Sequence, residues 1–94
     1  MAPGANLGDD AAVFEPVHGS APRHAGKNRA NPFAMMRSGA MLLRHIGEAD
    51  AAERLEAAIA DVTREGKTLT YDIARDGEPA STSQVVQAVV EKLR

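Results

Sequence analysis

The sequence predicts an α/β fold with one or two short strands and three helices. Three segments with helical apolar spacing, each bounded by residues that commonly cap helices, follow one another after residue 31. A short apolar run ahead of Pro16 is the best strand candidate, and a long polar loop separates it from the first helix. With 94 residues, the chain forms at most one small domain.

The N-terminal part is expected to contain little regular structure. Residues 1–11 are rich in Gly, Asp and Asn and are expected to form a loop. Residues 12–14 (Ala-Val-Phe) are the strand candidate, and we interpret this short segment as one strand of a larger sheet. The polar loop then runs from Glu15 to Asn31.

The first helix has clear start and stop signals. Asn31 as N-cap and Pro32 in the first helical position are typical of a helix start, and Gly47 is the expected C-cap. The helix between them, PFAMMRSGAMLLRHI, is apolar nearly all round. Such a helix needs burial on most of its sides, which a chain this small cannot provide.

A second helix is expected from a cap at Asp50 to about Glu65, where Gly66 ends it. Its apolar residues recur at amphipathic spacing.

The C-terminal part begins with LTYDI, a short extended segment or turn, and RDGEP, which is typical of a turn. Ser81 and Gln84 form a capping-box pattern ahead of VVQAVVEKL, the expected terminal helix.

Composition excludes several classes of protein. The net charge of −2 and pI near 5.9 argue against a nucleic-acid-binding or anionic-membrane-binding protein. Because the chain has no cysteine, disulfides, thiolate nucleophiles and zinc–sulfur sites are excluded. There is no apolar run of membrane-spanning length and no signal-peptide pattern, so a soluble, cytoplasmic protein is expected.

The polar loop has the composition of a phosphate-binding segment. Glycines near both ends free the backbone amides, and clustered cations favour a phosphate-bearing ligand. The cations are Arg23, Lys27 and Arg29. A solvated, turn-rich connection explains the same composition, and the residues by themselves leave both interpretations open.

A metal site is not favoured. His18 and His24 lie six positions apart with no obvious third ligand, which is a poor pattern for zinc. Asp9-Asp10 is interpreted as a solvated turn, and His45 as a packing or capping residue of the first helix.

The motif GANLGDDAAVFEPVHGSAPRHAGKNRANP resembles the C-terminal cofactor loop of the β-decarboxylating dehydrogenases, the family of isocitrate, isopropylmalate, homoisocitrate and tartrate dehydrogenases. The resemblance continues through MLLRH and TYD into the terminal helix. It implies that residues 1–94 are a partial cofactor-binding domain, the C-terminal part of the large domain of that non-Rossmann α/β fold. Met1 falls inside the family's APGAN motif, so we expect a segment of a larger enzyme.

The resemblance also implies a dinucleotide site. The adenosine loop would be formed by His18, Gly19, Ser20, Ala21 and Pro22. Asn31 would contact the adenine.

The residue after HGSAP bears on the choice of dinucleotide. NAD-dependent isopropylmalate dehydrogenases typically carry Asp there, whereas this chain has Arg23 followed by His24. NADP-dependent isocitrate dehydrogenases resemble this chain, with a Lys-Tyr pair there and a TYD-x-x-R segment downstream, which Tyr71 and Arg75 match. Cations and a phenol suit a 2′-phosphate, so NADP is expected and NAD is the alternative. The competing interpretation is that Tyr71 is a core residue and Arg75 is a surface charge.

No catalytic residue and no metal ligand can be assigned within the chain. The family oxidises and decarboxylates a small 2-hydroxy acid with Mg²⁺ or Mn²⁺, using upstream residues and residues from the second subunit of a homodimer. We therefore expect the isolated chain to be inactive and unstable. The expected function is the cofactor segment of an NADP-linked isocitrate dehydrogenase, which forms 2-oxoglutarate; the alternatives are an NAD-linked isopropylmalate or tartrate-type enzyme and a helical protein-interaction module.

Overall fold

The computed structural model describes residues 2–17, 22–74 and 77–94. Two strands form an antiparallel hairpin, and three helices follow a long loop that contains one described 3₁₀ turn, as predicted for the fold class. The strands are β1 (Pro3–Leu7) and β2 (Ala12–Pro16). The 3₁₀ turn is η1 (Pro22–His24), and the helices are α1 (Phe33–His45), α2 (Ala49–Glu65) and α3 (Thr82–Leu93).

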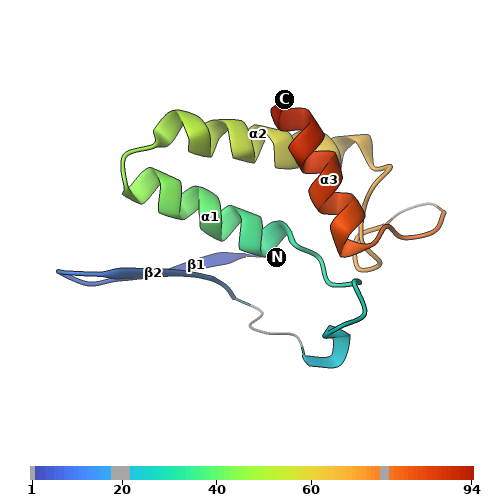
Figure 1. Ribbon diagram of the computed structural model, residues 1–94, viewed down its shortest axis with the longest axis horizontal. Helices are drawn as coiled ribbons and strands as arrows, with labels where there is room; N and C mark the ends of the chain where they lie inside the picture. The colour runs from blue at the N-terminus through green and yellow to red at the C-terminus, as the bar shows by residue number, and fades with distance from the viewer. Residues whose placement is uncertain (1, 18–21, 75–76) are drawn as a thin grey trace.

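Helix α1 lies between the hairpin and α2, and α3 crosses α2 near the C-terminal end of α2 (Figure 1). The hydrophobic core sits where the start of α1 meets α2 and α3. Its buried members are Phe33, Ala58, Ile59, Val62, Leu69, Val85 and Val89. The core therefore lies next to the end of the polar loop, which enters α1 immediately before Phe33.

The expectation of a loop over residues 1–11 is wrong for Pro3–Leu7, which forms β1. Its Ala5 pairs with Phe14 of β2, and the hairpin turn is closed by a hydrogen bond of 2.8 Å from Gly8 N to the carbonyl of Ala11. The segment PGANL has low intrinsic strand propensity, and pairing with β2 overrides it.

Both ends of α1 use the residues that the sequence indicated. Asn31 Oδ1 accepts a hydrogen bond of 2.9 Å from Phe33 N, although the helix begins one residue later than expected. Gly47 has φ of +93°, and Glu48 N donates to the carbonyl of Leu43 at 2.7 Å, which is a Schellman motif. The N-cap itself is Pro32 and the C-cap is Ile46, so Asn31 and Gly47 act at the two helix ends from one residue outside the cap positions.

The start of α2 differs from the prediction. The helix begins at Ala49, so Asp50 lies inside its first turn, where its negative charge favours the positive end of the helix dipole instead of capping the helix. Gly66 ends the helix with φ of +71°, as expected. The capping box of α3 is confirmed, since Gln84 N donates to Ser81 Oγ and Ser81 N donates to Gln84 Oε1.

Two exposed ion pairs connect the helices. Arg44 of α1 binds Glu56 of α2 at 2.9 Å, and Lys92 of α3 binds Glu65 of α2. The hydrogen bond from each partner raises the pKa of Arg44 and of Lys92. At such exposure these pairs contribute little to the stability of the fold.

The apolar surface of α1 is only partly covered, as its composition predicted. Met35 is 58% exposed and Ile46 is 62% exposed, while Phe33 and Ala34 are buried. Among the helices that the structure describes, none is both long and apolar enough to cross a lipid bilayer.

Candidate dinucleotide-binding site

The polar loop is attached to the rest of the chain first through Asn31. The Asn31 side chain is buried, and its Nδ2 donates to Asp72 Oδ2 at 3.1 Å while its Oδ1 caps α1. Thr70 Oγ1 donates to the other carboxylate oxygen, Asp72 Oδ1, at 2.6 Å. The loop, the start of α1 and the TYD segment are thus fixed to one another by a single amide side chain.

A second attachment joins the loop to the N-terminus of α3. Asn28 Nδ2 donates to Ser83 Oγ at 2.8 Å, and Asn28 Oδ1 accepts from Ser83 N at 3.0 Å. The Asn28 carbonyl accepts from Thr82 N at 2.9 Å, and Thr82 Oγ1 donates to the carbonyl of Ala30 at 2.5 Å. Residues separated by more than fifty positions in the sequence are therefore held side by side.

A pocket of about 270 Å³ opens between these two attachments. Its lining comes from the loop, the TYD segment and the start of α3: Lys27, Asn28, Arg29, Tyr71, Pro79, Ala80, Ser81 and Gln84. The charged residues in this lining are Lys27 and Arg29, so the pocket favours an anion. A neighbouring pocket of about 470 Å³ contains Lys67 together with Glu78 and Glu91, which makes it unsuitable for one.

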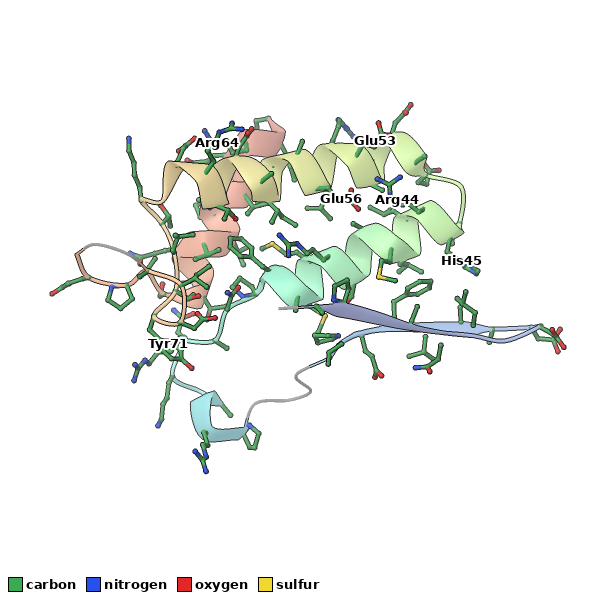
Figure 2. All side chains as sticks on the ribbon, turned by 180° about the vertical axis from the view of Figure 1, so that it is seen from behind. Arg44, His45, Glu53, Glu56, Arg64 and Tyr71 are labelled. Carbon is green, nitrogen blue, oxygen red and sulfur yellow. The ribbon has the colours of Figure 1, made fainter. Side chains whose placement is uncertain are left out.

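Tyr71 lies at the loop end of the molecule, opposite the end that carries Arg44 and His45 (Figure 2). The Arg29 guanidinium lies 5.0 Å from the centroid of the Tyr71 ring, which is a cation–π distance. Tyr71 is 41% exposed, so the interpretation of this residue as part of the core is wrong.

The structure places the other expected site residues as follows. Pro22 and Arg23 lie in η1 and are exposed, and Arg23 is not part of the described lining of the pocket. The backbone of His24 ends η1. Four residues of the expected adenosine loop, His18, Gly19, Ser20 and Ala21, lie outside the described residues, as does Arg75.

Sequence reasoning did not assign Asn28, Ser81 or Gln84 to the site. Lys27 and Arg29 were recognised as loop cations, but nothing in the sequence indicated that they border Tyr71. The available signal was the Ser81–Gln84 capping box, which fixed the start of α3 without showing that the loop binds there.

No group of three or more His, Cys, Asp or Glu suited to a metal ion occurs within residues 2–17, 22–74 and 77–94. The ring centroids of His45 and Phe14 lie 5.4 Å apart, so the packing role expected of His45 is confirmed. Asp9 and Asp10 are exposed in the hairpin turn.

Comparison with known proteins identifies relatives in one family of dehydrogenases. A profile of the isocitrate/isopropylmalate dehydrogenase family matches residues 1–89. The NADP isocitrate dehydrogenase of Archaeoglobus fulgidus is 45% identical over all of this chain and 23% of its own length. Subunit 2 of the mitochondrial NAD isocitrate dehydrogenase of Kluyveromyces lactis is 42% identical over 99% of this chain and 25% of its own length.

A solved structure shows the same fold. The crystal structure of isocitrate dehydrogenase from Methylococcus capsulatus superposes with a TM-score of 0.93 and 53% sequence identity, over 98% of this chain and 27% of that one. The chain thus spans about a quarter of the length of these relatives. The match of fold and of nearly the whole sequence shows that this chain belongs to the isocitrate/isopropylmalate dehydrogenase family.

Proposed function

We propose that this chain forms the adenosine end of the dinucleotide site in an enzyme that oxidatively decarboxylates isocitrate to 2-oxoglutarate with NADP. The observation that carries the proposal is the pocket in which Lys27 and Arg29 border Tyr71. Membership of a dehydrogenase family supplies the reaction class.

The chemistry of the pocket suits the 2′-phosphate that distinguishes NADP from NAD. A phosphate monoester carries up to two negative charges and three acceptor oxygens, and guanidinium and ammonium donors match it. The cation–π contact holds the Arg29 guanidinium beside the phenol, so both face the same pocket. Arg23, which lies in η1, and Arg75 are the residues that the family resemblance assigns to this group, and they would add further cations.

Asn31, which the family resemblance assigns to adenine, also has a structural role in the proposed site. Both polar atoms of the side chain already bond within the protein, to Phe33 N and to Asp72. In the proposed site, the side chain of Asn31 therefore holds the loop in place.

Other parts of the proposed enzyme lie outside this chain. Substrate carboxylates, the Mg²⁺ or Mn²⁺ ion and the proton-transfer groups would be bound or supplied by residues other than these 94. A homodimer in the cytoplasm is the proposed form of the whole enzyme.

An NAD-linked member of the family is the second candidate. An NAD isocitrate dehydrogenase subunit is among the relatives, so family membership alone does not select the cofactor. The two cations in the described lining of the pocket favour NADP because NAD has no 2′-phosphate for them to bind. No observation favours the helical interaction module over membership of an enzyme family.

The test is calorimetric titration with adenosine 2′,5′-bisphosphate and with ADP. The protein is a chimera in which this chain replaces the matching segment of the Methylococcus capsulatus enzyme, chosen because the two folds superpose closely. We expect preference for the 2′-phosphate and a loss of roughly tenfold or more in that affinity for Arg29→Asp, since Arg29 lines the pocket and charge-assisted hydrogen bonds contribute about 1.5–3 kcal/mol.

Arg54→Asp is the matched control, because it makes the same charge change on the exposed surface of α2. Equal binding of the two nucleotides, or an equal loss in both variants, would favour the NAD-linked alternative. Binding of neither nucleotide by the folded chimera would contradict the dinucleotide site itself.

A further inference from the structure

The cationic part of the loop has little apolar burial to hold it. Pro22, Arg23 and residues 25–29 are all exposed, so this stretch does not contribute to the hydrophobic core. An exposed segment of this kind adopts many conformations unless hydrogen bonds restrict it. The bonds that the structure shows between this stretch and α3 come from Asn28.

Asn28 suits this position for two reasons. Its backbone has φ of +55°, in the left-handed region that Asn tolerates better than most residues other than Gly. Its side-chain amide both donates to and accepts from Ser83, at 2.8 and 3.0 Å. Glycine would satisfy the backbone requirement alone, and Ala would satisfy neither requirement.

The residues on either side of Asn28 are the two cations of the pocket, Lys27 and Arg29. Fixing the backbone of Asn28 restricts the positions that the side chains of both neighbouring cations can adopt. It also keeps the Arg29 guanidinium within 5.0 Å of the Tyr71 ring centroid. The attachment to α3 therefore acts on the anion-binding wall of the pocket, although Ser83 itself is not part of the described lining.

We propose that Asn28 is a positioning residue: by bonding Ser83 and Thr82 it holds Lys27 and Arg29 beside Tyr71, so that the pocket is formed before the 2′-phosphate end of the dinucleotide arrives. This inference rests on the proposed function. A loop that is already ordered loses less conformational entropy on binding, so the bonds from the Asn28 side chain to Ser83 strengthen binding of the ligand.

The test compares Asn28→Gly, Asn28→Ala and Ser83→Ala in the same chimera. Gln87→Ala is the control, because Gln87 is exposed one helical turn further along α3. Asn28→Gly keeps the backbone conformation and removes both side-chain bonds. Ser83→Ala removes the Oγ partner and keeps the bond from Ser83 N to Asn28 Oδ1.

Three quantities are measured for each variant: affinity for adenosine 2′,5′-bisphosphate and for ADP, kcat at saturating NADP and isocitrate, and hydrogen–deuterium exchange over residues 25–30 and 82–85. For Asn28→Gly we expect roughly fivefold weaker binding of the bisphosphate, because two exposed hydrogen bonds are lost. ADP affinity should change by less than about twofold, kcat should fall by a smaller factor than the bisphosphate affinity does, and exchange should accelerate in both segments.

We expect a larger loss for Asn28→Ala than for Asn28→Gly, because alanine is unfavourable at positive φ. Ser83→Ala should lose less than either. The inference is overturned if Asn28→Gly weakens both nucleotides equally, or if it leaves bisphosphate affinity at the level of the Gln87→Ala control.

Failure of the proposed function gives a different pattern. If the unmodified chimera binds neither nucleotide, the dinucleotide site is contradicted and the affinity role of Asn28 falls with it. Unchanged affinity in Asn28→Gly, with a parent that prefers the bisphosphate, contradicts only the role of Asn28.

Discussion

Asn31→Ala is expected to be the most informative single substitution, because one buried side chain joins three segments. It accepts from Phe33 N at the start of α1 and donates to Asp72 in the TYD segment, whose other oxygen accepts from Thr70. Alanine removes both bonds and leaves the Phe33 N–H without its partner in a buried setting.

The size of the effect follows from these two losses. Removing an Asn cap costs about 1 kcal/mol, and losing a hydrogen bond to an exposed carboxylate costs about another 1 kcal/mol. For a domain of 150–250 residues, about 2 kcal/mol lowers the melting midpoint by roughly 4–8 °C. Because the isolated chain is small, the melting of the chimera is the safer measurement.

An exchange of the two side chains tests the reasoning more sharply. Asn31→Asp alone retains a cap acceptor but sets two carboxylates against each other, so it should be destabilising. Adding Asp72→Asn restores a donor: the new amide oxygen accepts from Thr70, and the new amide nitrogen donates to the carboxylate at position 31. That carboxylate also lies at the positive end of α1, where it is favourable.

We therefore expect the double variant Asn31→Asp, Asp72→Asn to melt within about 2 °C of the parent and well above either single variant. Additive losses in the double variant would refute the argument, because they would show that the two side chains do not act through their mutual bond. A melting point for Asn31→Ala equal to that of the parent would refute the assigned cap and its bond to Asp72 together.

Three further substitutions follow from the helix ends and the core, each measured by thermal melting of the chimera. Gly47→Ala should cost about 1–2 kcal/mol because its φ is +93°, and Gly47→Asn should cost less; equal losses would contradict the conformational explanation. Ser81→Ala should cost about 1 kcal/mol by removing the α3 cap, and an unchanged melt would contradict that role. Val85→Ala should cost about 2 kcal/mol because Val85 is fully buried, and a loss no larger than that of Gln87→Ala would contradict its place in the core.

The helices could be predicted from sequence because their ends are set by local chemistry. The hydrogen bonds and turns that end these helices join residues only a few positions apart. They involve Asn31, Gly47, Gly66 and the Ser81 capping box, so the helix ends can be recognised in the sequence. Strand β1 was missed because its stability comes from pairing with β2 instead of its own composition.

The candidate site was only partly predictable for a related reason. The composition of the loop and the TYD segment indicated a phosphate-bearing ligand, and Tyr71 indeed lines a pocket with two loop cations. The attachment of Asn28 to Ser83 spans 55 positions in the sequence and has no periodic pattern. Contacts of this kind depend on how α3 packs against α2, which sequence spacing does not reveal.

The part of the molecule formed by the hairpin and α1 differs from the polar loop in how its side chains are satisfied within this chain. In the hairpin and α1, apolar side chains such as Leu7, Met35 and Ile46 remain exposed within this chain. On the loop side, Asn28 and Asn31 bond to segments that are themselves part of the chain. The polar loop is thus held in place by residues that follow it in the sequence. Helix α3 is therefore part of the architecture of the candidate site, although its buried residues Val85 and Val89 do not line the pocket.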